Sequence, residues 1–103
     1  MMKIIIDLDG TICTEEKFEE RSKARVLKGA KKTIEILKKK GNKIIIYSAR
    51  PWSQYEMTKK WLKKNKIKFD YLLLGKPIGD YWIDDRSLNF QNWEKINKFF
   101  KKK

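Results

Sequence analysis

The sequence predicts an α/β domain with a mostly parallel central sheet of about four strands. Four short runs of β-branched, aromatic or leucine residues are each followed by turn residues, as buried strands are. Amphipathic segments of helical period separate the first three runs. Alternation of strands and helices is typical of parallel sheets, and the chain has no repeat or linker. We therefore expect one domain over residues 1–103.

The expected strands follow one another along the whole chain. They cover residues 3–7, 43–48, 71–75 and 81–84. The first run, KIIID, is continuously apolar, which indicates a strand that is buried on both faces. Residues 13–25 lack such a run, so we expect a surface excursion there, at most a short flap.

Three helices are expected between and after these strands. Residues 27–42 place Leu27, Ala30, Ile34 and Leu37 at helical spacing, and Gly41 supplies the end. In residues 52–65, Ser53 and Glu56 have the spacing of a capping box, and Tyr55, Thr58 and Leu62 share a face that Trp61 flanks. Residues 92–103 place Trp93, Ile96 and Phe100 on one side of a terminal helix.

The connection between the third and fourth runs is too short for a crossover helix. Either a nearly extended segment crosses the sheet there, or the third strand is short and lies at the edge. The sequence leaves both open.

Charge and cysteine content limit the environment and the partners. The formal net charge is +13, which attracts anions such as phosphorylated metabolites, nucleic acid and acidic lipid surfaces, although a lysine-rich solvated surface is the simplest explanation. The single cysteine, Cys13, allows no internal disulfide, which favours a reducing compartment. The apolar runs are too short to span a bilayer and no signal pattern begins the chain. We expect a cytoplasmic protein with no membrane partner; a homo-oligomer is compatible with the sequence.

The ends of the four runs carry the candidate chemistry. In parallel sheets, ligands bind outside the carboxyl ends of the strands. Asp7 and Asp9 follow the first run and point the same way, about 6–7 Å apart. The later runs end in Ser48-Ala49-Arg50, in Gly75-Lys76, and in Asp84-Asp85-Arg86.

These residue types match what phosphoryl transfer to a carboxylate requires. An aspartate can attack phosphorus, and a divalent cation offsets the repulsion between carboxylate and phosphate. Mg²⁺ suits this task because it binds one or two carboxylates together with phosphate oxygens. A hydroxyl and an ammonium can hold the phosphoryl oxygens, and a second carboxylate can move the proton.

The pattern resembles the haloacid dehalogenase-like (HAD) superfamily of phosphotransferases over nearly the whole chain. IIIDLDGT at residues 4–11 matches its first motif, the strand ending in Ser48 its second, and GKP and WIDDR its lysine and acidic motifs. The resemblance implies a three-layer Rossmann-like fold. No segment is long enough for a cap domain, so the chain looks like a small capless phosphatase.

The resemblance also implies roles for particular residues. Asp7 would be the nucleophile and a metal ligand, and Asp9 the general acid/base, with its backbone carbonyl on the metal. The Mg²⁺ shell would be completed by Asp84 or Asp85. The remaining expected roles are phosphate binding by Thr11, Ser48, Ala49 and Lys76, and substrate contact by Arg50 and Arg86.

The expected function is a Mg²⁺-dependent phosphomonoesterase that forms an aspartyl-phosphate. A small phosphorylated substrate such as a sugar phosphate is favoured, because no basic-aromatic binding motif is visible. A nucleic-acid-end (3′-) phosphatase is the alternative within the same chemistry. Two alternatives are not enzymes: a non-catalytic phospho-accepting module and a nucleic-acid-binding module. The DxDGT turn argues against the phospho-accepting module, since Asp9 would serve to hydrolyse the aspartyl-phosphate.

Overall fold

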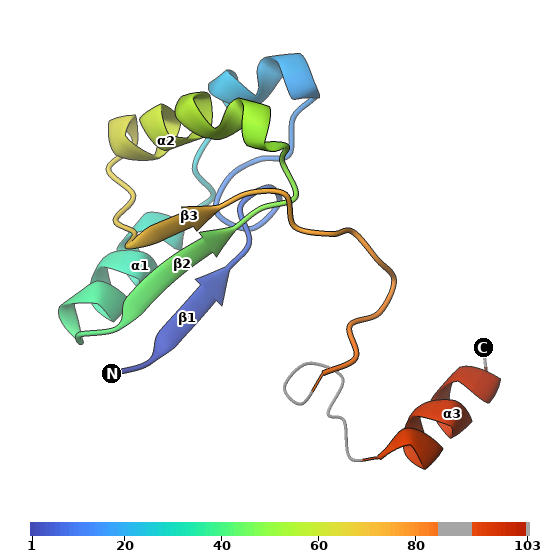
Figure 1. Cartoon of the computed structure of the whole chain (residues 1–103). Coiled ribbons are helices and arrows are strands. Elements are labelled where there is room, and N and C mark those ends of the chain that lie inside the picture. Colours follow the sequence, from blue (N-terminus) through green and yellow to red (C-terminus); the bar gives the residue numbers. More distant parts are fainter. Residues whose placement is uncertain (85–91, 103) are drawn as a thin grey trace.

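The computed structural model describes residues 1–84 and 92–102, and over this range it confirms an α/β fold with a parallel sheet and no cap domain. Strands β1 (Lys3–Ile6), β2 (Lys43–Tyr47) and β3 (Tyr71–Leu73) pair in parallel in the order β1-β2-β3. Ile4 lies opposite Ile44, and Ile46 lies opposite Leu72. Figure 1 shows the three carboxyl ends meeting at one edge of the sheet.

The helices lie close to where the hydrophobic periodicity predicts them. Helix α1 (Ala30–Lys39) begins after Gly29. The 3₁₀ helix η2 (Trp52–Gln54) leads into α2 (Tyr55–Lys64), where Gln54 is the N-cap and makes no side-chain capping bond. The predicted capping box of Ser53 and Glu56 is therefore wrong, because the 3₁₀ turn places both residues away from the cap position.

One face of the sheet carries the hydrophobic core. Ile44 and Ile46 of β2 are fully buried against Ile34 of α1 and against Trp61 and Leu62 of α2. The opposite face is open in the described part of the chain: Ile5 is 64% exposed and Tyr71 is 58% exposed. Burial on both faces of the first strand was predicted and is not found, because α1 and α2 pack on the same side.

Asp70 fixes the start of two strands to the end of α1. Its carboxylate accepts bonds from Nζ of Lys38, at 2.7 and 2.9 Å, and from the amide of Ile44 at 2.7 Å. The hydrogen bond from Lys38 and then the one from Ile44 hold the pKa of Asp70 below its usual value.

The excursion, residues 13–25, folds back on the domain. It contains the 3₁₀ helix η1 (Phe18–Lys23). Thr14 donates its backbone amide to the carbonyl of Arg25 at 2.8 Å, which closes the base of the excursion. Nε1 of Trp61 donates to the carbonyl of Ala24 at 2.9 Å and so ties the excursion to α2.

Strand β3 is short and lies at the edge of the sheet, which decides between the two alternatives that the sequence left open. Gly75 follows it at φ +74°, and a Cβ at this position would come within 2.8 Å of Nε1 of Trp52. Beyond Gly75 the chain forms a strap, residues 76–79, that has no regular secondary structure and lines the pocket described below. The amide of Lys76 donates to the carbonyl of Ser48 at 2.9 Å, which ties the strap to the end of β2.

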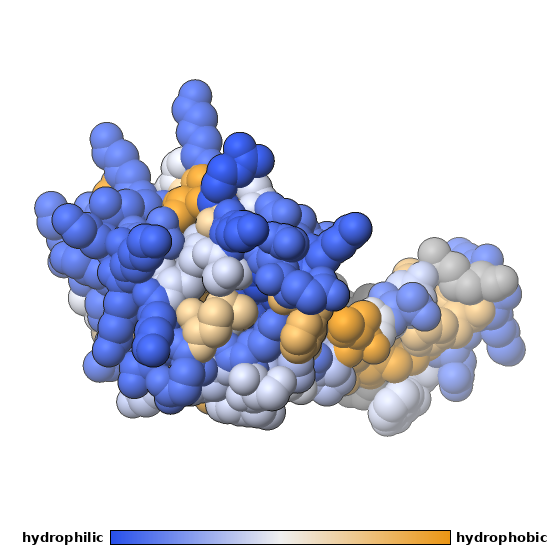
Figure 2. Space-filling model, turned by 90° about the horizontal axis from the view of Figure 1, so that it is seen from above, coloured by the Kyte–Doolittle hydropathy of each residue, from blue (hydrophilic) through white to orange (hydrophobic). Residues whose placement is uncertain are grey.

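The predicted fourth strand at residues 81–84 is wrong: these residues are not in a strand. The strap leads instead into an arm that carries α3 (Trp93–Lys101) away from the sheet (Figure 1). Tyr81 packs edge-on against Phe99 and Phe100, with ring centroids 5.3 and 5.1 Å apart. The radius of gyration is 16.1 Å, above the roughly 13 Å of a compact domain of this length. Figure 2 shows apolar side chains gathered toward this arm, whereas hydrophilic ones cover most of the rest of that face.

Among the described residues, no helix has the length and apolar character that a membrane crossing requires.

We expect the two faces of the sheet to respond differently to truncation. Ile46→Ala removes a fully buried side chain and should lower the free energy of unfolding by about 2–4 kcal/mol. Ile5→Ala, at an exposed position of the same sheet, should lower it by less than about 1 kcal/mol. Urea unfolding followed by circular dichroism measures both, and equal losses would contradict the one-sided core.

Candidate active site

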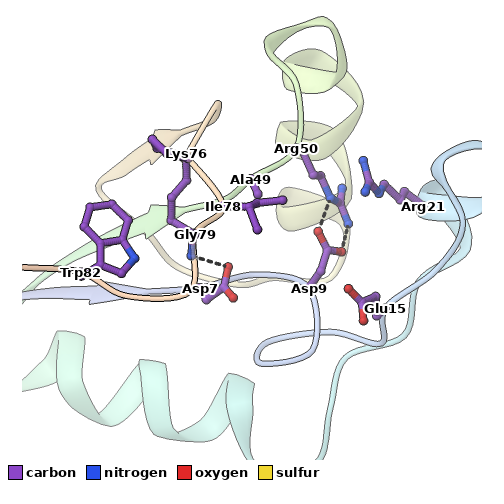
Figure 3. A pocket seen from close by; sticks show the side chains of 11 residues that line it. Asp7, Asp9, Glu15, Arg21, Ala49, Arg50, Lys76, Ile78, Gly79 and Trp82 are labelled. Atoms are coloured by element: carbon purple, nitrogen blue, oxygen red, sulfur yellow. Dashed lines mark hydrogen bonds and ion pairs between the residues drawn. The ribbon is translucent and has the colours of Figure 1, made fainter. Parts of the chain in front are cut away.

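A pocket of about 350 Å³ lies at the carboxyl ends of the strands (Figure 3). Its floor carries Asp7 and Asp9, which follow β1. The end of β2, the strap, the excursion and Trp82, which follows the strap, form the walls. The residues from the first three of these are Ala49, Arg50, Lys76, Pro77, Ile78, Gly79, Glu15 and Arg21.

Asp7 and Lys76 lie together at one end of this pocket, as predicted. Nζ of Lys76 is 3.2 Å from Oδ1 of Asp7, and the Asp7 side chain is 44% exposed. The same oxygen accepts the amide of Leu8 at 2.8 Å, which fixes the carboxylate at the end of β1. Lys76 also lies over the ring of Tyr47, with Nζ 5.8 Å from the centroid. A half-exposed carboxylate beside an ammonium can receive an anionic ligand at this point.

Asp9 is held by a buried arginine rather than by solvent. Nε and Nη2 of Arg50 donate to the two carboxylate oxygens at 2.9 and 2.7 Å, and Nη1 donates to the hydroxyl of Thr58 at 2.9 Å. The side chain of Arg50 is fully buried. The sequence suggested that Arg50 contacts the substrate; although Arg50 lines the pocket, its guanidinium is occupied by Asp9 and Thr58.

The pKa of Asp9 is lowered by this arrangement. Burial acts to raise it, but the hydrogen bonds and charge of Arg50, with a smaller contribution from the charge of Arg21, outweigh burial. Asp9 is therefore ionised at neutral pH before a substrate arrives, which is the state that can accept a proton.

Cys13 lies behind Asp9, with Sγ 3.7 Å from Oδ1. Burial, and then the charge of Asp9, raise the pKa of this thiol to about 12. A protonated buried thiol is no nucleophile.

Two of the predicted phosphate-binding residues lie outside the pocket. Ser48 is fully buried, and its hydroxyl accepts the amide of Arg50 at 3.1 Å, so it caps the turn after β2. Thr11 lines a separate hollow with Gly29 and Thr33 beside α1. Of this predicted set, Ala49 and Lys76 line the pocket.

Of the predicted acidic motif the structure describes only Asp84, and it does not bring this residue to the pocket. Asp84 is exposed and does not line the pocket, because residues 81–84 do not form the strand that was expected to deliver it. Asp85 and Arg86 lie outside the described residues. Their assignment as metal ligands and substrate contact stays a prediction.

The sequence reasoning missed the walls of the pocket. Arg21 and Glu15 come from the excursion, which has no apolar periodicity to predict how it folds back. Residues 77–79 and Trp82 line the pocket because no crossover helix follows β3. The short connection was the one signal in the sequence that pointed to such a strap.

The described residues meet a minimal requirement for Mg²⁺, which binds one or two carboxylates and otherwise phosphate oxygens and water. The half-exposed Asp7 can supply one ligand. Each carboxylate oxygen of Asp9 already accepts a bond from Arg50, so the backbone carbonyl of Asp9 is the group that we assign to a metal. Within residues 1–84 and 92–102 no cluster of three or more acidic, cysteine or histidine side chains exists.

Comparison with known families gives one match over most of the chain. The family model of the LNS2 domain of PITM 1-3 matches residues 4–92. This family is a HAD-like domain of the phosphatase type, in agreement with the resemblance drawn from the motifs. A sequence comparison with curated proteins found no match.

Solved structures share the fold over nearly the whole chain. The crystal structure of an MCSG target from Vibrio cholerae is 26% identical, with a TM-score of 0.68, and the match covers 99% of this chain and 98% of that one. A chain of the Pnkp1/Rnl/Hen1 complex is 26% identical over 82% of this chain, with a TM-score of 0.65. The Pnkp1/Rnl/Hen1 RNA repair complex gives a similar match, at 26% identity and a TM-score of 0.65 over 79% of this chain. The present chain spans only 31% and 27% of those two longer chains.

Removal of Arg50 should destabilise the domain strongly. Arg50→Met leaves the carboxylate of Asp9 partly buried without its partner, and we expect a loss of about 3–5 kcal/mol in the free energy of unfolding at pH 7. Arg25→Met, which removes an exposed arginine outside the pocket, is the matched control and should change it by less than about 0.5 kcal/mol. Urea unfolding of the three proteins measures this.

The pH dependence of that loss provides a second check. The folded pKa of Asp9 lies below the unfolded value of about 3.9, so the ion pair stabilises the fold fully above pH 4 and its contribution disappears as pH falls through the folded pKa. The difference in the free energy of unfolding between wild type and Arg50→Met should therefore become smaller below about pH 4. If this difference stayed the same from pH 7 to pH 3, the stabilising role of the ion pair between Arg50 and Asp9 would be contradicted.

Proposed function

Because this chain belongs to the LNS2 domain family of PITM 1-3, we propose that it is a small, capless, Mg²⁺-dependent phosphomonoesterase that works through an aspartyl-phosphate on Asp7. One observation supports this proposal most directly. Asp7 presents a half-exposed carboxylate at the carboxyl end of β1, 3.2 Å from the ammonium of Lys76, in a pocket whose next acid is Asp9.

In the first step, an oxygen of Asp7 attacks phosphorus and the bond from phosphorus to the leaving oxygen breaks. Lys76 neutralises charge on the phosphoryl oxygens as the transition state forms. The leaving oxygen takes a proton from Asp9. Because Asp9 is ionised in the free protein, it takes up this proton from solvent as the substrate binds, when the negative charge of the phosphate favours the protonated carboxyl group.

In the second step, Asp9 accepts a proton from a water molecule that attacks the aspartyl-phosphate. The bond between phosphorus and Asp7 breaks, inorganic phosphate is released, and the Asp7 carboxylate is restored. The ion pair with Arg50 suits Asp9 to this half-reaction, because it favours the ionised form that a general base needs.

Mg²⁺, held by Asp7 and the backbone carbonyl of Asp9, would offset the charge repulsion between the nucleophile and the phosphate. We propose Asp84 or Asp85 as the further ligand; Asp84 does not line the pocket, so this role would require it to move toward the carboxyl end of β1.

A small phosphorylated metabolite, such as a sugar phosphate or sugar-acid phosphate, is the substrate class that we favour. The strap and the excursion enclose the site from two sides, which favours a small ligand. The second candidate is a nucleic-acid 3′ end. The net charge of +13 and the likeness to chains of the Pnkp1/Rnl/Hen1 RNA repair complex favour it.

The catalytic roles are tested by substitution of each acid. Wild type should hydrolyse an aryl phosphate with Mg²⁺ and stop when EDTA is added. Asp7→Asn should lower kcat by about 10³-fold or more, because the nucleophile is lost. Asp9→Asn should lower it by about 10²–10⁴-fold, because proton transfer is lost.

Asp80→Asn is the matched control, since this carboxylate is exposed and does not line the pocket, and its kcat should stay within about twofold of wild type. Turnover that needs no metal and survives both active-site changes would reject the enzyme. Stable incorporation of phosphate after acetyl phosphate treatment, seen by intact mass, would favour a phospho-accepting module instead.

The substrate class is tested with a panel of phosphate esters. We expect kcat/KM for the best sugar or sugar-acid phosphate to exceed that for a 3′-phosphorylated oligonucleotide by about tenfold or more, which corresponds to about 1.4 kcal/mol of transition-state binding. A large excess in the other direction would identify the nucleic-acid end as the substrate. Salt-dependent oligonucleotide binding without any turnover would indicate a binding module.

A further inference from the structure

Among the described residues that line the pocket, one cation, Arg21, has no ion-pair partner of its own. Lys76 is paired with Asp7 and Arg50 with Asp9, whereas Arg21 forms no ion pair with a carboxylate among the described residues. Figure 3 shows Lys76 above Asp7 at one side of the pocket and Arg21 at the other side, beyond Arg50. A substrate whose phosphoryl group lies at Asp7 would therefore extend toward Arg21.

The excursion holds Arg21 in a fixed position. Its Nη1 donates to Oε1 of Gln54 at 2.7 Å, and its guanidinium lies over the ring of Phe18, 5.5 Å from the centroid. Gln54 is itself buried and donates through Nε2 to the carbonyl of Phe18 at 3.1 Å. These contacts orient the guanidinium before any ligand arrives, so binding costs little further side-chain entropy.

The contacts with Gln54 and Phe18 do not use the whole hydrogen-bonding capacity of the guanidinium. Gln54 accepts only from Nη1, and Nε of Arg21 is buried without a hydrogen-bond partner among the described residues. A buried donor without a partner costs stability, and such groups are rare in folded proteins. Nε and Nη2 form a fork whose geometry matches the two oxygens of a carboxylate or phosphate.

A purely structural role does not account for these observations. Tying η1 to η2 needs only the bond from Nη1 to Gln54, and Trp61 already anchors the excursion at Ala24. Glu15 lines the same pocket but is exposed and forms no ion pair with Arg21, and the carboxylate of Asp9, which the charge of Arg21 reaches, is held by Arg50. A structural role therefore explains neither the unused Nε and Nη2 of Arg21 nor its charge without an ion-pair partner.

We propose that Arg21 binds a second anionic group of the substrate, a carboxylate or a second phosphate, at the opposite end of the pocket from the phosphoryl group that is transferred. This inference rests on the proposed function and sharpens it. The substrate is then a phosphomonoester that carries another negative charge, and Arg21 determines the specificity. A carboxylate would come from a sugar-acid phosphate, and a second phosphate from a nucleotide.

The test measures equilibrium binding rather than turnover, in the full chain with Asp7→Asn so that bound phosphoesters are not hydrolysed. The first ligand pair is glycerol 3-phosphate and 3-phosphoglycerate, which differ by one carboxylate. The second pair is thymidine 3′-monophosphate and thymidine 3′,5′-bisphosphate, which differ by one phosphate. Calorimetry gives the ratio of the Kd values within each pair.

With Arg21 present, we expect the extra anionic group to lower Kd by about 10- to 100-fold in one of the two pairs. The pair in which Kd falls shows whether Arg21 binds a carboxylate or a second phosphate. Arg21→Met should reduce that gain to about twofold or less. Arg21→Lys should keep part of it, because a point charge remains but the fork is lost. Arg25→Met, which removes an exposed arginine two residues after η1, is the matched control and should keep the full gain.

The proposal is overturned if neither pair shows a gain with Arg21 present, in an Asp7→Asn protein whose thermal unfolding matches wild type, a result that needs no substitution at Arg21. It is also overturned if the gain survives Arg21→Met in a protein whose thermal unfolding matches wild type. Since binding to the Asp7→Asn protein does not depend on catalysis, these results are distinct from a failure of the proposed function, which would appear as absent turnover in wild type.

Discussion

The buried contact between Arg50 and Asp9 joins the parts of the chain that build the site. Arg50 follows β2, Asp9 follows β1, and Thr58, which accepts the third bond, lies in α2. An arginine cannot be neutralised by losing its proton, so the interior must supply a complete set of acceptors for it. The carboxylate of Asp9, the hydroxyl of Thr58 and Sγ of Cys13, which is 3.9 Å from Nη2, are the side-chain acceptors that the described residues supply. Two strand ends and one helix are thereby held at fixed positions around the pocket.

The contact between Arg50 and Asp9 also gives the two aspartates different roles. Both follow the same strand, and an extended backbone directs both side chains to the same side. Asp9 is committed to Arg50, whereas Asp7 meets only the more exposed Lys76 and the amide of Leu8. Asp7 is therefore the carboxylate that a ligand can reach. Because each acid has its own cation, the pocket floor does not repel anions even though it carries two carboxylates.

Local sequence predicts the floor of this site better than its walls. The positions of Asp7 and Asp9 follow from one strand and its side-chain alternation, and the placement of Lys76 follows from the end of another strand. No local sequence pattern predicts which way a side chain points when its partner lies in another element. Ser48 and Arg50 are at the end of the second predicted strand, yet both side chains point inward. Ser48 caps a turn and Arg50 binds Asp9. Arg21 depends on how an aperiodic excursion folds onto α2, which is set by Gln54 and Trp61 far along the chain.

The short connection after β3 explains how a chain without a cap domain encloses a pocket. A crossover helix at this point would carry the chain away from the carboxyl ends of the strands. Here Gly75 turns the backbone at positive φ against Trp52, and the next residues stay at the rim as the strap. The amide of Lys76 is bonded to Ser48, so the side chain begins directly above the end of β2 and reaches Asp7. The same short segment therefore positions the lysine and forms one wall of the pocket.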